Sequence, residues 1–396
     1  MHMINKSKIV KIKLKRDLTR TIKQGHPWLF DDTLEDVPKV CPGTMAKLVD
    51  RKNKFVAFGF VYPESQLCFR VIQLEDSVPG EDFIIFRIEQ ALTLRKSVIS
   101  DQTNAYRLLN GEGDLLPGLV VDIFHKTAVL QLDGPGPFGF YDRKRIADYL
   151  LGKLGLDCVY FKARHNSDQK SEVLTGTFQT ENIEFLEHGA KFSCNIVDGQ
   201  KTGFFLDQRE NRFLIRKYAK DLRVLNMFSY TGGFSINAGL GGAKEVISVD
   251  ISKPASANAE LNWKLNGLDE TKHQSIPQNC FDFIEEANQK KKKWDLVIVD
   301  PPSFAPSKKA LDKAIISYQK IFTESLKLCD PQGYFAASSC SSHINQDLFL
   351  EICQNSISKA RKKAQIVFIG GQGCDHPYPL ALSEMRYLKF ILFKLY

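Results

Sequence analysis

The sequence lacks an apolar run of about 18 residues, and its nine cysteines include no Cys-x-x-Cys pair. A membrane-spanning helix is therefore not expected, and no membrane partner is predicted. Without paired cysteines a zinc site is not expected either, and no metal is predicted. The basic N-terminus is not followed by an apolar segment, so a secretory signal is not expected. Dispersed cysteines are typical of the reducing cytoplasm, which is the predicted location.

A nucleotide-type crossover is present at residues 224–250, but this stretch lacks the phosphate-binding fingerprint Gly-x-Gly-x-x-Gly. An apolar run at residues 223–228 precedes a turn with Gly232 and Gly233, and a second run at residues 245–251 carries Asp250. In such a unit the glycines let the backbone approach a ligand, and a carboxylate about 20 residues later binds ribose hydroxyls. A nucleoside without phosphates, such as S-adenosylmethionine, fits this pattern. A purely structural crossover is the alternative interpretation.

Positive charge is in excess, with a formal net charge of +8. The first 25 residues hold eight Lys or Arg against one acidic residue, and further clusters lie at residues 290–293 and 359–363. A polyanion, with RNA as the leading candidate, is the expected partner. Residues 23–30 interleave basic and aromatic side chains, as in surfaces that stack on bases. The alternatives are that Trp28 and Phe30 fill the core and that the lysine clusters are solvated helix ends.

Turn signals and hydrophobic patterns divide the 396 residues into three predicted domains. Residues 1–76 show short apolar runs between turns, which predicts a small β-barrel. Residues 77–190 predict a compact α+β unit that begins with a helix over residues 78–100. Residues 191–396 alternate strands with helices, which predicts a mostly parallel sheet covered on both faces. The strands expected there are residues 223–228, 245–251, 295–300, 333–338, 365–370 and 387–395, and the helices are residues 207–219, 255–266, 311–328 and 346–362.

Distinctive residues stand at the ends of four of these predicted strands. They are Phe228, Asp250, Asp300 and Cys340. Ligands of open α/β sheets bind beyond the carboxyl ends of the parallel strands. We therefore expect these four positions to contribute to one site.

The motif Asp-Pro-Pro-Ser-Phe occupies residues 300–304, directly after an apolar strand. A carboxylate at the strand end, a stiff turn containing Pro301 and the ring of Phe304 together can grip a planar base. A plain proline turn after a strand is the alternative. Upstream, residues 199–212 are dense in polar groups, and Gln208 is a candidate to close over a ligand at the first strand.

Cys340 lies in a polar loop of serines, three residues before His343. Carbon-5 of a pyrimidine is not nucleophilic, and the addition of a thiolate to carbon-6 activates it. Cys340 in this setting therefore indicates pyrimidine-C5 chemistry, whereas an inert loop thiol is the alternative. His343 is either a base or a surface histidine.

Taken in order, these motifs resemble those of the large-subunit ribosomal RNA cytosine-C5 methyltransferases that carry an N-terminal PUA domain. The matching stretches are residues 23–30, 111–118, 199–212, 224–234, 300–304 and 339–341. The resemblance covers nearly the whole chain. It implies an α/β fold, with a class I, Rossmann-like methyltransferase domain after a PUA-like barrel and a middle α+β domain.

The resemblance also implies a role for individual residues. S-adenosylmethionine would be bound by Gln208, Asn226, Phe228, Tyr230, Gly232, Asp250, Ile251, Asn279 and Asp300. Within this set Asp250 would take the ribose hydroxyls and Asn279 the adenine amino group, where family members often have an acid. Cys340 and Asp300 would be catalytic. The RNA would be contacted by Phe304, Pro301 and Trp28. The implied partner is ribosomal RNA, and a homodimer is left open.

Two other functions stay open from the residues alone. Methylation of a base amino group also uses an Asp-Pro-Pro-Phe turn and needs no cysteine. A non-catalytic RNA-binding or ribosome-assembly factor would keep the sheet as a scaffold.

Overall fold

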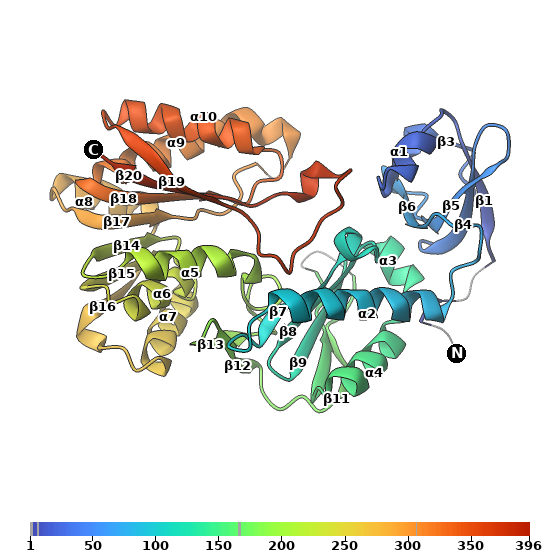
Figure 1. Ribbon diagram of the computed structural model, residues 1–396, viewed down its shortest axis with the longest axis horizontal. Helices are drawn as coiled ribbons and strands as arrows, with labels where there is room; N and C mark the ends of the chain where they lie inside the picture. The colour runs from blue at the N-terminus through green and yellow to red at the C-terminus, as the bar shows by residue number, and fades with distance from the viewer. Residues whose placement is uncertain (1–2, 6–7, 165–167, 306) are drawn as a thin grey trace. The chain divides into compact units, whose positions relative to one another are not determined.

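The computed structural model describes residues 3–5, 8–164, 168–305 and 307–396, with Lys308 described by its backbone only. Its contacts divide the chain into two compact units (Figure 1). The first unit comprises Met1–Ile183, Asn195–Phe204 and Cys374–Ser383, and the second comprises Glu184–Cys194, Phe205–Gly373 and Glu384–Tyr396. The boundaries of the three predicted domains stay a prediction. No described helix has both the length and the apolar character needed to cross a bilayer.

The N-terminal part of the first unit is a six-stranded sheet of order β2-β6-β5-β4-β1-β3. It packs around its own apolar cluster, which includes Leu14, Leu48 and Phe69. The expected β-rich segment, close to a barrel, is confirmed. The strands are β1 (Val10–Leu14), β2 (Trp28–Phe30), β3 (Leu34–Glu35), β4 (Thr44–Val49), β5 (Phe55–Val61) and β6 (Leu67–Gln73), and the short helix α1 spans Thr19–Lys23.

A second sheet in the same unit has the order β11-β10-β9-β8-β7. Helices α2 and α4 supply apolar residues to its core, including Ile88 and Ile146. The expected α+β unit, with its first helix near residues 78–100, is confirmed. The elements are α2 (Glu81–Val98), β7 (Ala105–Asn110), β8 (Leu119–Phe124), β9 (Thr127–Leu132), α3 (Pro135–Phe140), α4 (Arg143–Leu154), β10 (Cys158–Phe161) and β11 (Glu172–Gly176).

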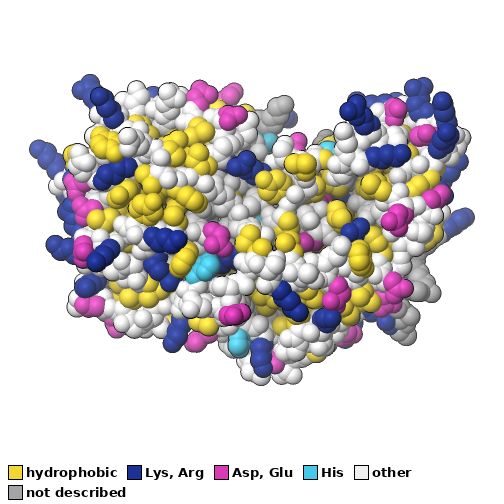
Figure 2. All heavy atoms as spheres, in the orientation of Figure 1, with side chains coloured by type: hydrophobic (Ala, Val, Ile, Leu, Met, Phe, Trp, Pro, Cys, Tyr) yellow, Lys and Arg dark blue, Asp and Glu magenta, His cyan; other side chains and the backbone are white. Residues whose placement is uncertain are grey.

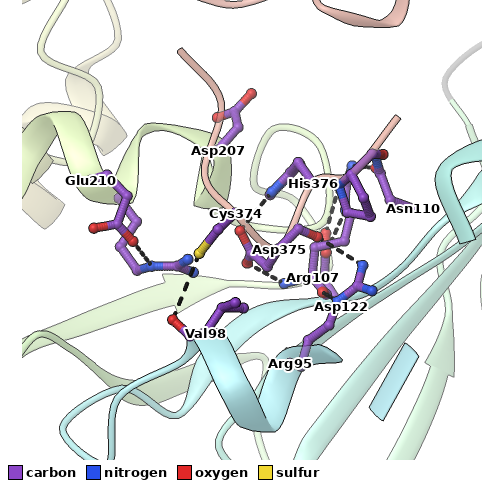
Figure 3. Close-up of polar contacts among 12 residues, drawn as sticks. Arg95, Val98, Arg107, Asn110, Asp122, Asp207, Glu210, Cys374, Asp375 and His376 are labelled. Atoms are coloured by element: carbon purple, nitrogen blue, oxygen red, sulfur yellow. Dashed lines mark hydrogen bonds and ion pairs between the residues drawn. The ribbon is translucent and has the colours of Figure 1, made fainter. Parts of the chain in front are cut away.

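The segment Cys374–Ser383 is distant in sequence from the rest of the first unit, yet polar contacts fix it there (Figure 3). The backbone N–H of Arg107 donates to Asp375 Oδ2 at 2.9 Å, and Asp375 Oδ1 lies 2.9 Å from His376 Nδ1. Arg95 donates to the Asp375 carbonyl at 2.8 Å and forms a buried ion pair with Asp114. Buried charges are stable only when paired in this way, so the network defines one position for the segment.

The second unit is built on a seven-stranded sheet of order β16-β15-β14-β17-β18-β20-β19. The first five strands are parallel, and β20 runs antiparallel to both of its neighbours. The predicted mostly parallel sheet is confirmed. The strands are β14 (Arg223–Met227), β15 (Glu245–Asp250), β16 (His273–Pro277), β17 (Trp294–Val299), β18 (Cys329–Ser339), β19 (Ala364–Gly370) and β20 (Lys389–Leu395), and a hairpin of β12 (Asn182–Glu187) and β13 (Ala190–Asn195) lies at the unit's start.

Helices cover both faces of this sheet, because consecutive residues of the central strands face opposite sides. Val224 packs in the cluster with Ile215 and Trp263, whereas Leu225 packs with Phe283 and Phe322. The helices are α5 (Arg209–Tyr218), α6 (Gly233–Leu240), α7 (Lys253–Leu265), α8 (Cys280–Gln289), α9 (Leu311–Lys327) and α10 (Gln346–Lys359).

Three elements of the second unit, β13, β16 and α8, were not among those predicted from hydrophobic patterns. Strand β16 is short and contains His273, Gln274 and Ser275, so it lacks an apolar run. Helix α8 follows it directly. Strand β18 also begins at Cys329 rather than at residue 333. An edge strand such as β16 needs fewer apolar residues, and its polar sequence concealed it.

Candidate active site

The four strand ends expected to share a site belong to adjacent parallel strands. The sheet places β15, β14, β17 and β18 side by side, so their carboxyl ends lie along one edge. Asp250 is the last residue of β15, and Phe228, Asp300 and Cys340 each follow the last residue of a strand. The structure therefore brings these residues to the edge where open α/β sheets bind ligands.

Ser341 joins the loop after β17 to the loop after β18. Its hydroxyl lies 2.9 Å from the Ser303 hydroxyl and 3.0 Å from that of Tyr318, and it accepts from the Ala305 N–H at 3.4 Å. Tyr318 comes from α9 and also receives a hydrogen bond from Ser339 at 3.0 Å. Since Ser341 and Tyr318 are fully buried, these contacts fix Cys340 relative to the Asp-Pro-Pro turn.

Asp300 is only partly exposed, and protein atoms surround its carboxyl group. Gln208 Nε2 donates to Asp300 Oδ2 at 2.9 Å and also to Ser338 Oγ at 2.9 Å. Burial raises the pKa of Asp300 to about 6, and the nearby charge of Asp207 acts in the same direction. The hydrogen bonds from Ser338 and Gln208 oppose this rise. The carboxyl group is thus available in both its protonated and its ionised form near neutral pH.

Gln208 is held by its own surroundings. Its Oε1 accepts from Asn211 Nδ2 at 2.6 Å, so both ends of its amide are engaged. Arg212 donates to the Phe205 carbonyl at 2.9 Å and forms a buried ion pair with Glu187, which fixes the turn before α5. The structure gives Gln208 the task of orienting Asp300. Its direct contact with a cofactor stays a prediction.

Strand β14 and the loop after it contain buried polar atoms that have no partner among the residues that the structure describes. They are Asn226 Oδ1 in the strand and Ser229 Oγ and Thr231 Oγ1 in the loop, and Asp207 Oδ1 before α5 is another such atom. Buried polar atoms are almost always hydrogen-bonded. A ligand with an ammonium and a carboxylate group, such as the methionine portion of S-adenosylmethionine, supplies matching donors and acceptors.

The backbone of this loop adopts left-handed conformations. Phe228, Tyr230 and Gly232 have φ values of 57°, 46° and 81°. Such conformations are unfavourable for residues with a Cβ atom and occur mainly where function or tight packing requires them. A Cβ atom on Gly232 would lie 2.9 Å from the Cβ atom of Ala259, so glycine is required there for close packing against α7.

Asp250 is oriented by the backbone of two turns. Its Oδ2 accepts from the Tyr230 N–H at 2.8 Å, and its Oδ1 accepts from the Ser252 N–H at 2.9 Å. A carboxylate oxygen has more than one lone pair, so both oxygens keep an acceptor direction for ribose hydroxyls. The predicted role of Asp250 is compatible with this geometry.

The surface beside Asp250 is apolar and exposed. Ile251 is 70% exposed, and Phe281 is 37% exposed with its ring 6.4 Å from the ring of Phe228. Such side chains suit contact with a planar adenine. Asn279 Oδ1 accepts from the Phe281 N–H at 2.9 Å and thereby caps α8. Its contact with the adenine amino group stays a prediction. Phe281 was not predicted, because its exposure depends on a helix that the sequence pattern did not reveal.

The candidate base-binding side is formed by the two loops that Ser341 joins. Phe304 is partly exposed and its ring lies 4.8 Å from that of Tyr318, while Pro301 is buried. Cys340 is partly exposed and forms no disulfide, and His343 is exposed. Cys340, Phe304 and Asp300 thus stand on the two loops that Ser341 joins, and their roles toward a base stay a prediction.

Trp28 belongs to the other unit, and its part in RNA binding stays a prediction. The ring is partly exposed, and its Nε1 donates to Glu112 Oε1 at 2.8 Å. Arg70 donates to the same oxygen at 3.0 Å. Trp28 is thus fixed by polar contacts rather than enclosed in the core.

Comparisons with known proteins identify the family to which the chain is similar. Residues 154–368 match the S-adenosylmethionine-dependent methyltransferase family and residues 12–74 match the PUA-like domain family. The chain is 35% identical to ribosomal RNA large subunit methyltransferase I of Vibrio cholerae over 93% of this chain and 95% of that protein. It is 36% identical to the protein of the same name from Tolumonas auensis, over 95% of this chain and 97% of that protein.

Solved structures show the same fold. A putative S-adenosylmethionine-dependent methyltransferase from Streptococcus mutans has a TM-score of 0.85 at 24% identity, over 97% of this chain and all of that one. A putative methyltransferase complexed with SAH has a TM-score of 0.83 at 24% identity, over 98% of this chain and 99% of that one. The expected PUA-like and Rossmann-like architecture and the expected cofactor are confirmed.

Substitution of Asp300 tests the electrostatics of the site without requiring activity. A pKa raised from 3.8 to about 6 means that the folded state holds a proton that the unfolded state has lost. Stability contributed by this group is therefore present below about pH 4 and lost as pH rises to about 6. Asp300→Asn keeps a neutral side chain at every pH. The free energy of unfolding of the variant minus that of the parent protein should therefore increase by about 2–3 kcal/mol from pH 4 to pH 7.

Urea unfolding of both proteins across this pH range measures the difference. Asp282→Asn, at a carboxylate in the first turn of α8, is the control and should show no such pH-dependent gain. A constant difference between Asp300→Asn and the parent would contradict the raised pKa.

Proposed function

The chain belongs to the S-adenosylmethionine-dependent methyltransferases, and we propose that it forms 5-methylcytosine in the RNA of the large ribosomal subunit. Relatives named ribosomal RNA large subunit methyltransferase I align with nearly the whole chain, which supports large-subunit ribosomal RNA as the substrate. The observation that carries the choice of cytosine-C5 is the position of Cys340. Its thiol lies on a loop joined through Ser341 to the turn that carries Asp300 and Phe304.

S-adenosylmethionine supplies an electrophilic methyl group when bound, and the chain's own residues make the base reactive toward it. The thiolate of Cys340 adds to carbon-6 of the cytosine, forming a carbon–sulfur bond and moving electron density to carbon-5. Protonated Asp300 donates a hydrogen bond to the ring nitrogen N3, which stabilises the charge that develops there. The pKa of about 6 makes this protonated form accessible. After methylation, loss of the carbon-5 proton to a base breaks the carbon–sulfur bond and restores the thiolate.

The surrounding residues orient the base. Gln208 fixes Asp300, and Tyr318 supports both the ring of Phe304 and the loop of Cys340. Orientation of this kind converts a bimolecular addition into an intramolecular one. A base held between a ring and a carboxyl group must first leave its RNA stack, and unpaired or weakly stacked cytosines are therefore the expected targets.

RNA binding is assigned to both units through charge and through the PUA-like domain. The net charge is +8, and Lys and Arg side chains are distributed over the face shown in Figure 2. Residues 12–74 match the PUA-like family, and they include the partly exposed ring of Trp28. Contacts with phosphates supply affinity without selecting a sequence. We place the reaction in the cytoplasm, where ribosomal RNA is found and thiols stay reduced.

Cys340→Ala should abolish 5-methylcytosine formation, because carbon-5 is not nucleophilic without addition at carbon-6. Bisulfite sequencing of ribosomal RNA from cells that express only the variant measures the product. Cys374→Ala removes another exposed thiol and should leave the modification intact. If Cys340→Ala still methylates RNA and mass spectrometry finds an amino-methylated base, the chemistry is amino-group methylation. If wild-type protein binds S-adenosylmethionine but modifies no RNA, the proposed activity fails.

We also propose that the second copy in a homodimer pairs along β19. This strand is at the edge of the sheet, and four consecutive apolar side chains at residues 366–369 are exposed. Its sequence has neither charge nor proline, which are the usual guards of an edge strand. Antiparallel pairing of two copies about Val367 would place Ile366 opposite Phe368, the two residues between which β19 has an irregular register with β20.

Analytical ultracentrifugation at micromolar concentration tests this pairing. The parent protein should sediment as a dimer, and Ile366→Lys should shift it to monomer because a charge then lies in the strand interface. Ile316→Lys changes an exposed apolar residue of α9 and should leave the dimer unchanged. A monomeric parent protein would rule out the pairing.

A further inference from the structure

Lys389 is a buried amine beside the reactive loop, and the mechanism above leaves it without a task. It is 1% exposed and begins β20, directly opposite Ser339 of β18. Its Nζ donates to the Ser341 carbonyl at 2.6 Å and to the Tyr387 carbonyl at 2.7 Å. The amine of Lys389 is thus bound to Ser341, which follows Cys340, and the backbone of Lys389 pairs with Ser339, which precedes Cys340.

Among the described residues, no carboxylate forms an ion pair with Lys389, and its Nζ donates to two backbone carbonyls instead. Burial lowers the pKa of Lys389 to about 8, and Arg386 acts in the same direction. Cys340 is the group whose negative charge opposes this shift. Ionisable groups on neighbouring segments include Tyr387, whose hydroxyl donates to Asp207 at 2.7 Å, Tyr318 of α9 and Asp300 at the adjoining strand end.

Other cysteines in the second unit show why a counter-charge matters. Burial raises the pKa of Cys280 to about 12, and Cys353 is shifted upward by burial alone. A thiol in such surroundings stays protonated and cannot add to a base. Cys340 is less buried than these thiols, and unlike Cys280 and Cys353 it lies close enough to a lysine for its charge to affect that amine.

We propose that Lys389 is a positioning residue that keeps Cys340 as a thiolate. The S–H bond of Cys340 breaks and an N–H bond forms on Nζ, so a neutral thiol–amine pair becomes a thiolate–ammonium pair with no change in net charge. The two carbonyl bonds hold the ammonium in place while the thiolate is consumed and regenerated. The use of this pair in catalysis rests on the proposed function, whereas its existence does not.

The rate of Cys340 alkylation by iodoacetamide against pH tests the pair without cofactor or RNA. The alkylated peptide is quantified by mass spectrometry, which separates Cys340 from the exposed Cys41 and Cys374. In Lys389→Met alkylation at pH 7 should be slower by on the order of tenfold, with the midpoint of the profile moved upward. Lys394→Met alters another lysine of β20 and should match the parent protein.

Methyl transfer gives a second readout. In Lys389→Met, kcat should fall with KM unchanged, and activity relative to the parent protein at the same pH should recover as pH rises from 7 to 9 because the thiol then ionises without help. A merely structural loss would not recover with pH. Equal alkylation profiles for the parent and Lys389→Met would overturn the inference and leave the proposed function standing. Retained methylation in Cys340→Ala would instead overturn the proposed function.

If Lys389→Met does not fold, NMR titration of the Lys389 side chain replaces the alkylation test. The lysine should lose its proton at lower pH in Cys340→Ser than in the parent protein, because the variant removes the negative partner. An unchanged titration would overturn the inference.

Discussion

The buried hydroxyl of Ser341 is the contact on which the site depends. This hydroxyl joins the turn after β17 to the loop after β18. The backbone carbonyl of the same residue accepts a hydrogen bond from Lys389. Parallel strands bring loops to one edge of a sheet, but they do not fix the distance between two loops. Tyr318 adds a second link from α9, so the two loops are held from both sides. In the proposed mechanism Asp300 and Cys340 act on the same base, and this small polar cluster fixes their loops relative to each other.

Burial shifts the two ionisable groups beside this cluster in opposite directions. It raises the pKa of Asp300 to about 6 and lowers that of Lys389 to about 8. Both values lie near neutrality, where a group can exchange a proton at little cost. The same dry environment would leave a lone thiol protonated, as it does for Cys280. Burial thus shifts the pKa of Asp300 and of Lys389 toward neutrality, while hydrogen bonds from Gln208 and to the Ser341 carbonyl fix the two side chains.

The sequence predicted the strand ends well, because long apolar runs mark buried parallel strands. It predicted Asp250, Asp300 and Cys340 as neighbours without any knowledge of distances. It did not reveal β16, because an edge strand can be polar, or Phe281, because the exposure of that ring depends on α8. The three predicted domain boundaries stay a prediction. The contacts divide the chain into two units, and the first of them includes the distant segment Cys374–Ser383.

The sequence alone could not predict residue roles that depend on the pairing of segments far apart in the chain. Lys389 stands 49 positions after Cys340, and only the antiparallel pairing of β18 with β20 places it opposite Ser339. The contact of Gln208 with a cofactor stays a prediction, whereas its hydrogen bonds to Asp300 and Asn211 could not be foreseen from the sequence. Such assignments follow from hydrogen bonds between segments that are far apart in the chain, and no local pattern encodes them.

The central claim is that Cys340 forms a covalent bond with carbon-6 of a cytosine. The most direct measurement uses large-subunit ribosomal RNA in which 5-fluorocytidine replaces cytidine, with S-adenosylmethionine present. Fluorine at carbon-5 cannot leave as a proton does, so the carbon–sulfur bond should persist. We predict a protein–RNA species that survives denaturing electrophoresis and whose cross-linked peptide contains Cys340. The absence of such a species, with the same protein methylating unsubstituted RNA, would contradict the account.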